Sequence, residues 1–146
     1  MLFRSAPGHV LQVVQATTTT EQTTTSSSWV TTSFSASITP TSSSSKILIT
    51  YGANCRVPSV ASAICQTTIY RGATNIAPTA TRGFTQLQAA SANQIDAAQY
   101  ATYLDSPATT SSTTYTVYFQ NTGASGTIRW CVDGSYGSMT LIEVAV

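Results

Sequence analysis

Three short runs in the last third of the chain alternate between apolar and polar residues, and they constrain the fold more than any other feature. The runs are 115–120, 127–132 and 139–146. A period of two places successive side chains on opposite faces of a β-strand. Asp133-Gly134, between the last two runs, is a strong turn signal. This segment therefore predicts antiparallel strands that continue to the end of the chain.

The same alternation recurs in the first two thirds of the chain. Residues 29–40 place Val30, Phe34 and Ile38 on one face and serines on the other, which is typical of a half-buried strand. Residues 46–54 are apolar on both faces, which favours a central strand. The sequence predicts further strands at 9–15, 63–71, 84–90 and 97–104, an extended edge segment with a loop over 17–28, and a short helical turn over 86–92 as the alternative to a strand there.

About nine or ten short strands, separated by regular turn signals, are typical of an all-β antiparallel sandwich or barrel. Within that class we favour a jelly roll. The length of 146 residues is that of one domain. We expect a single β-sandwich domain over residues 9–146. Residues 1–8 are expected to be a disordered or artefactual tail, with natural sequence missing before Met1.

Composition supports the all-β assignment and limits the classes of partner. Charged residues make up 8% of the chain, against about 25% in typical domains. Serine and threonine, which favour turns and strands, make up about a third. The formal net charge is +1 and the basic residues are scattered, which argues against nucleic-acid binding. Such a weakly repelling surface fits an oligomer or a part of a larger assembly better than the alternative, an uncharged monomer.

The sequence contains no targeting or membrane signal. Residues 1–14 lack the apolar core of a secretory signal peptide. No stretch approaches the roughly 18 consecutive apolar residues of a membrane helix. The sequence therefore predicts no membrane insertion.

Titratable groups are few and form no catalytic motif. His9 is expected at a strand end on the surface, and Asp105 and Asp133 are expected in turns, where aspartate bonds its own backbone. Glu143 is expected to face outward or to pair with an arginine. No G-x-S-x-G, H-E-x-x-H or phosphate-binding loop pattern occurs. The sequence predicts a protein that is not an enzyme, with no catalytic residues, cofactor or metal site.

The cysteines, Cys55, Cys65 and Cys131, are odd in number and widely spaced, without a C-x-x-C pair. This spacing gives poor support to a metal site. We expect three buried thiols, since free cysteine packs as a small apolar residue. One disulfide plus a free thiol is the alternative.

Tyrosines are the best candidates for binding contacts. Tyr136 lies at a turn tip, and we expect it to contact a receptor, with Tyr103 and Tyr100 as further candidates. An exposed tyrosine ring suits both sugar stacking and protein contact. Tyr118 and Trp130 are instead expected to pack in the core or on a sheet face.

The first and last strands are apolar on both faces. We therefore expect them to lie side by side in the middle of the inner sheet. The change of parity after Leu141 predicts a bulge or two-sided burial in the last strand. The predicted subunit interface contains Val10, Val14, Ile142 and Val144.

Several segments together resemble a known class of proteins. These segments are Val-Leu-Gln-Val-Val-Gln at 10–15, Ile-Thr-Pro, a serine run and Ser-Lys-Ile-Leu-Ile over 38–49, Leu-Asp-Ser-Pro at 104–107 with Thr-Tyr-Thr-Val at 114–117, and Met-Thr-Leu-Ile-Glu-Val-Ala at 139–145. In pattern, they resemble small virion structural proteins of tailed phages, over roughly residues 10–146. The three cysteines and residues 86–99 depart from that pattern.

The resemblance implies a compact jelly-roll sandwich, similar in style to the trimeric tumour-necrosis-factor-like heads. The implied function is that of a fibre head, knob or capsid-decorating subunit, which acts by assembly and surface adhesion. The implied location is the virion, assembled in the host cytoplasm. The implied partners are two further copies in a homotrimer, other virion proteins and a host-surface glycan.

Two other functions are compatible with the same residues. A secreted carbohydrate-binding module would present an exposed aromatic platform. A subunit of a self-assembling filament would exchange its N-terminal strand between protomers, and the two-sided apolar residues 10–14 fit that role.

Overall fold

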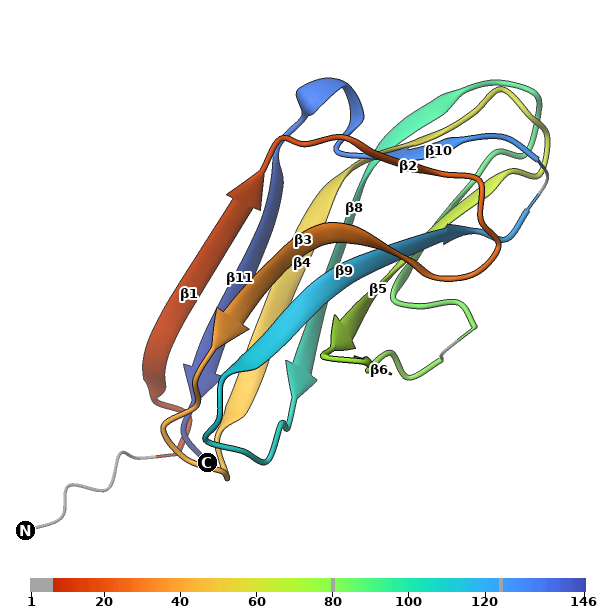
Figure 1. The fold of residues 1–146 in the computed structure, drawn as a ribbon. Coiled ribbons are helices and arrows are strands. Elements are labelled where there is room, and N and C mark those ends of the chain that lie inside the picture. The colour runs from red at the N-terminus through yellow and green to blue at the C-terminus, as the bar shows by residue number, and fades with distance from the viewer. Residues whose placement is uncertain (1–6, 80, 124) are drawn as a thin grey trace, which may run out of the picture.

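Two antiparallel β-sheets pack face to face (Figure 1). The computed structural model describes residues 7–79, 81–123 and 125–146. Sheet A contains β1 (Val10–Thr18), β2 (Gln22–Thr24), β4 (Lys46–Val57), β8 (Ile95–Asp105), β10 (Ile128–Trp130) and β11 (Gly137–Val144). Sheet B contains β3 (Val30–Ile38), β5 (Ile64–Arg71), β6 (Thr74–Asn75), β7 (Thr85–Gln88) and β9 (Thr113–Asn121). The predicted all-β antiparallel sandwich is confirmed.

The strands pair in a nested order, so that segments far apart in the sequence become neighbours. β1 pairs with β11, β3 with β9, β4 with β8 and β5 with β7. β10 and β11 follow one another along the same side of β4, and β2 and β1 follow them in turn. Sheet A is therefore four strands wide in effect, and Figure 1 shows β1, β11, β4 and β8 in this succession.

The core lies between the two sheets, as the alternation of apolar residues predicts. On β3, Phe34 and Ile38 are buried, whereas Ser35 between them is exposed. Ile49 of β4 is fully buried on the opposite sheet, and Phe34 packs against Trp130 with ring centroids 5.4 Å apart. Burial of each large apolar side chain contributes about 1.5–3 kcal/mol. This layer therefore holds the sheets together.

The last strand has a regular register, which corrects two predictions. β11 pairs with β4 without interruption, from Ser138 opposite Gly52 to Val144 opposite Lys46. Of the two predicted alternatives, the bulge in β11 is therefore wrong, and the irregularity lies in β1, between Val10 and Gln12. The outward residues of β11 are half-buried, which agrees with the other alternative, burial on both faces. The parity of the apolar residues changes because Glu143 occupies an inward position and is fully buried. The prediction that Glu143 faces outward or pairs with an arginine is wrong.

The first and last strands are adjacent, as predicted, but their position in the sheet differs from the prediction. β1 pairs with β11 on one side only, whereas β11 also pairs with β4. β1 is thus an edge strand of sheet A and does not lie in the middle of the sheet. The reason is that β4, which has apolar residues on both faces, takes the central place between β11 and β8.

Some strand limits differ from the prediction because of tertiary pairing. β4 continues through Val57, beyond the predicted end at residue 54, because Cys55 pairs with Ala97 of β8 and Trp130 of β10. Residues 85–88 form a strand on β5, and the helical alternative is wrong. Asp105 ends β8 in a buried position and does not lie in a turn.

The predicted N-terminal tail is only partly described, because residues 1–6 lie outside the described residues. Of the remaining two, Gly8 donates its N–H to the carbonyl of Ala145 over 2.8 Å, beside the start of β1. Within the described part of the chain, no helix has the length and apolar character needed to span a bilayer.

Candidate functional site: the outer face of sheet A

A row of apolar side chains crosses the outer face of sheet A from edge to edge. The register places Val13 opposite Ile142, Ile142 opposite Leu48 and Leu48 opposite Leu104. Val13 is 58% exposed and Leu104 is 47% exposed, and the other two are half-buried. We call these four residues the apolar row. Aligned aliphatic side chains on a solvent-facing sheet are unusual, because one face of such a sheet is normally polar.

Two further rows lie beside the apolar row. The register aligns Gln15, Thr140, Thr50 and Thr102 in one row and Thr17, Ser138, Gly52 and Tyr100 in the next. We call these eight residues and the apolar row the central face. None of its twelve residues is charged. A surface that is flat, uncharged and partly apolar has the composition of the core of a protein–protein interface.

Tyr100 lies flat on the central face because of the glycine opposite it. A Cβ atom on Gly52 would lie 2.0 Å from Cδ1 of the Tyr100 ring and 2.6 Å from the carbonyl oxygen of Gln99. Only glycine therefore allows this close approach. The ring stays 61% exposed, which leaves a large flat aromatic surface toward the outside.

Charged side chains gather at one end of sheet A and neutralise one another. Arg56 of β4 donates to both carboxylate oxygens of Asp96 over 2.7 and 2.6 Å and to Asp133 over 2.8 Å. Glu21 accepts hydrogen bonds from Arg129 and from the backbone N–H of Asp133. The hydrogen bond from Arg56 lowers the pKa of Asp96. These pairs flank the row that contains Tyr100, and Lys46, opposite Val144, lies beyond the apolar row at the other end of the central face.

The outer face of sheet B has a different chemistry. It carries hydroxyl and amide side chains and a stacked pair, Tyr70 and Tyr118, whose ring centroids are 4.0 Å apart. A chain of amide hydrogen bonds joins Gln120, Gln66 and Gln86, at 2.8 and 2.9 Å. A cavity of about 370 Å³ is lined by Gln66 and Gln86 of this chain of amides and also by Gln88 and Arg82. This face has no counterpart of the apolar row among its described residues.

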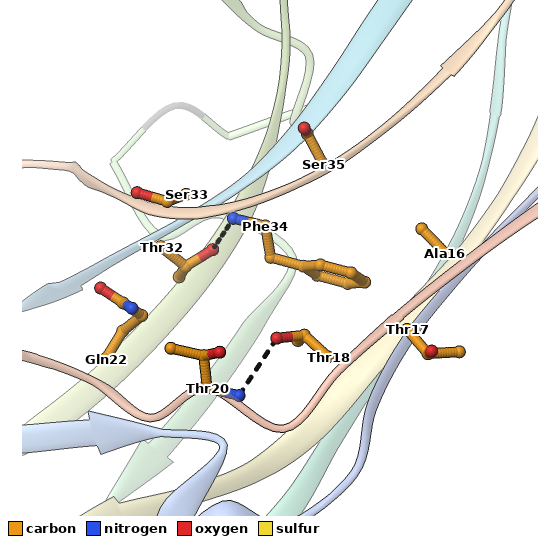
Figure 2. A pocket seen from close by; sticks show the side chains of 9 residues that line it. All are labelled: Ala16, Thr17, Thr18, Thr20, Gln22, Thr32, Ser33, Phe34 and Ser35. Carbon is orange, nitrogen blue, oxygen red and sulfur yellow. Dashed lines mark hydrogen bonds between the residues drawn. The ribbon is translucent and has the colours of Figure 1, made fainter.

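A second cavity of about 270 Å³ lies on the open side of the sandwich, between β1–β2 and β3 (Figure 2). Its walls carry hydroxyl groups and the Gln22 amide, and Phe34 lies inside it. Next to it, β3 bulges away from β9 between Thr31 and Ser35, and Ser33 has a φ of 60°. At the bulge, the Thr32 hydroxyl replaces backbone hydrogen bonds between β3 and β9. It donates to the carbonyl of Val117 and accepts from the N–H of Phe34.

Two carboxylates are buried in polar clusters inside the fold. Glu143 accepts hydrogen bonds from Nε2 of Gln12 over 2.6 Å and from the backbone N–H and hydroxyl of Thr41 over 2.7 and 2.8 Å. Burial disfavours the charge, but these donors outweigh it and lower the pKa of Glu143. Asp105 accepts two hydrogen bonds from Arg71 and one from the Tyr115 hydroxyl. Burial and this hydrogen bond raise the pKa of Tyr115.

All five carboxylates of the chain are thus engaged by the protein's own donors, two inside the sandwich and three in the charged end of sheet A. Among the described residues, no group of three or more histidine, cysteine, aspartate or glutamate side chains is placed to hold a metal ion.

The three cysteines are free thiols, and all are buried, which is the arrangement favoured by the sequence. Burial raises the pKa of Cys131 to about 11. A hydrogen bond with Cys65, together with burial, raises the pKa of Cys55. Both groups therefore stay protonated at neutral pH, and a protonated thiol is a poor nucleophile.

The three tyrosines predicted as receptor contacts differ in their exposure. Tyr136 and Tyr100 are 60% and 61% exposed, as a contact residue requires. Tyr103 faces inward from β8 and packs against Phe84, with ring centroids 5.2 Å apart. This inward position suits a receptor contact less well than that of Tyr100, and the receptor contacts stay predictions. Tyr118 is stacked on a sheet face and Trp130 is in the core, as predicted.

The four residues predicted for the subunit interface do not all lie on the same face of sheet A. Val10 is 59% exposed, and Ile142 and Val144 lie on the outer face of sheet A. Val14 faces inward and packs against the core, so it suits an interface less well than Val10, and the subunit interface stays a prediction. The sequence prediction missed Val13, Leu48 and Leu104. The available signal was their position on strands with apolar residues on both faces.

No protein-family model matches the chain, and no curated protein matches it in sequence.

Proposed function

We propose that the protein is a non-enzymatic structural subunit of a tailed-phage virion, as a fibre head, a knob or a capsid-decorating protein. The observation that carries the proposal is the central face, twelve uncharged residues that include the apolar row. Interface cores are depleted in charged residues and enriched in aromatic ones, and the central face has no charged residue and includes the exposed Tyr100. It is the surface that packs against a neighbouring subunit.

The order of the strands supports a jelly roll as the finer description of the sandwich. β1, β11, β4 and β8 form one sheet, and β3, β9, β5 and β7 form the other. A jelly roll consists of eight strands in two such sheets. The C-terminal strand is thereby locked between two others, which suits a subunit that must stay folded outside a cell.

The engagement of the carboxylates supports a structural role over a catalytic one. Acid–base catalysis requires a titratable group that can reach a substrate. Glu143 and Asp105 are instead buried under hydrogen bonds from Gln12, Thr41, Arg71 and Tyr115. Asp96 is occupied by Arg56.

Self-assembly through the central face can be tested by placing a charge in the apolar row. We expect light scattering coupled to size-exclusion chromatography to give a multiple of the 15.3 kDa chain mass, three in the proposed homotrimer. Leu104→Lys should raise the dissociation constant at least tenfold, because a buried unpaired charge is costly. Leu104 is exposed in the single chain, so this change should not disturb folding.

Ser35→Lys is the matched control, since Ser35 is exposed on sheet B, away from the central face. It should leave the mass unchanged. A wild-type monomer at micromolar concentration, or equal effects of the two substitutions, would contradict the proposal. The virion location has its own test, because mass spectrometry should find peptides of the chain in density-gradient fractions of intact particles. Their absence from particles that contain the other virion proteins argues against it.

The exposure of Tyr100 and Tyr136 favours glycan binding as a second candidate function. Exposed aromatic rings stack on the apolar faces of sugars, and each contact contributes about 1 kcal/mol. On a glycan array, Tyr100→Ala or Tyr136→Ala should reduce binding to any recognised glycan about fivefold. Tyr103→Phe, at an inward-facing ring, is the control and should bind normally. An array without signal for the wild type rules out this function for the glycans presented.

A further inference from the structure

The sandwich has four sheet edges, and three of them are protected against pairing with another strand. An unpaired edge is a template for strand addition, so proteins protect edges with bulges, charges, short strands or covering segments. On sheet B, β3 carries a bulge between Thr31 and Ser35. The opposite edge of sheet B is split into β7 and β6, of four and two residues. On sheet A, β7 lies beside the middle of β8, where Thr85 donates a hydrogen bond to Gln99, and the ends of β8 carry the exposed Asp96 and the inward-facing Asp105.

Within the described part of the chain, the fourth edge, β1, is unprotected over seven residues. From Gln12 to Thr18 its register with β11 is regular. This segment contains no charged residue, proline or glycine. Because β1 pairs on one side only, every second residue points its N–H and C=O away from β11. The partner that satisfies these groups best is another extended strand.

We propose that β1 pairs antiparallel with β1 of a second copy of this chain, about a two-fold axis at Gln15. Gln15 is the middle of the regular segment, so this register pairs the whole seven-residue segment with the same segment of the second copy. Gln15 lies opposite Gln15 of the second copy, and Val13 lies opposite Thr17. The proposal deepens the self-assembly described above and rests on it, since it identifies one contact through which copies join.

The central face explains why a second copy is the occupant. A two-fold axis perpendicular to the sheet keeps the outer faces of both copies on the same side. The row that contains Gln15 is the middle one of the three rows of the central face. The two central faces therefore form one continuous surface, and no charged residue lies at the contact between the two β1 strands. The result is an eight-stranded sheet about 34 Å wide, at about 4.8 Å per strand.

The pairing can be tested by a charge swap at Gln15. In Gln15→Lys alone, and in Gln15→Glu alone, the paired copies should dissociate, because like charges directly opposite one another on paired strands repel. An equimolar mixture should recover the assembly as the mixed species, which native mass spectrometry distinguishes by mass. With this contact added to the proposed homotrimer, the wild type should give even multiples of 15.3 kDa, such as the six chains of two joined homotrimers. Ser35→Lys and Ser35→Glu, on the protected edge strand β3, are the matched controls and should keep the wild-type mass.

A cysteine at the axis gives a second, independent readout. Gln15→Cys should form a covalent dimer when oxidised with copper phenanthroline, because directly opposed residues have the Cα spacing of a disulfide. Val13→Cys should not, since it faces Thr17 of the second copy. The buried native thiols give a low background.

The outcomes separate this inference from the proposed function. Recovery in the mixture together with the Gln15→Cys dimer supports the pairing. If Gln15→Lys keeps the assembly mass of the wild type while Leu104→Lys has a lower mass, the pairing is overturned and the proposed function is left intact. Trimers alone, without any even multiple, likewise overturn only the pairing. A wild-type monomer overturns both. Binding of β1 to an extended peptide of another virion protein, without mixed species, also overturns the pairing of two copies.

Discussion

Asp105→Asn should lower the free energy of unfolding by about 3 kcal/mol, because it removes the charge from a buried ion pair. Asp105 is 6% exposed and accepts hydrogen bonds from Nη1 of Arg71, at 2.9 Å to each oxygen, and from the Tyr115 hydroxyl at 2.7 Å. These contacts join β8, β5 and β9, so both sheets lose a cross-link. Urea denaturation followed by circular dichroism measures the change.

Asp96→Asn is the matched control for this prediction. Asp96 also accepts two short hydrogen bonds from an arginine, Arg56, but its side chain is 41% exposed. Exposed ion pairs contribute less than about 1 kcal/mol, because water replaces the lost partner. The loss at Asp105 should therefore be several times the loss at Asp96. Equal losses would mean that burial does not control the strength of these pairs, and the interpretation of the Asp105 cluster would be wrong.

Glu143→Gln should destabilise the protein by about 2 kcal/mol at pH 7, because its donors require an ionised acceptor. Gln12 and two groups of Thr41 all donate to the carboxylate, and an amide offers one oxygen and places an N–H₂ group against a donor. Hydrogen bonds to a charged group contribute about 1.5–3 kcal/mol each when formed inside a protein. The cluster joins β1 and β11 to the loop that follows β3.

The dependence on pH identifies the charge as the cause. The pKa of Glu143 is lower in the folded state than its ordinary value. Its stabilisation is therefore complete above the unfolded pKa, about 4.3, and is lost as the pH falls below that value through the folded pKa. Urea midpoints of the wild type and Glu143→Gln should converge as the pH falls from 7 toward 3. A difference that is constant over this range would show that packing, and not ionisation, accounts for the loss.

The distribution of polar groups divides the molecule into two functional parts. Charged groups hold elements together inside the fold and at one end of sheet A, through Glu143, Asp105 and Arg56. The central face has none of them. A sheet that kept its charges for internal contacts and left a flat uncharged face outside is suited to packing in an assembly, which is the basis of the proposed virion role.

The sequence alone determined the fold class and most strands, because a period of two is a local property. Phe34 and Ile38 alternate with serines on β3, and Tyr115, Val117 and Phe119 alternate with polar residues on β9. The same local reasoning predicted that the first and last strands are neighbours, since both are apolar on two faces. Turn signals such as Asp133-Gly134 separated the strands correctly.

Only the tertiary structure decided which faces are covered and which edges are free. A period of two identifies two faces of a strand but not the one that faces the core, so the inward place of Glu143 and the outward place of Val13 could not be read from the chain. The apolar row exists because Val13, Ile142, Leu48 and Leu104 share one register. The same register brings together Gln12 and Glu143, which lie 131 positions apart in the chain. Pairing over such distances is set by the packing of the whole sandwich, and no local pattern encodes it.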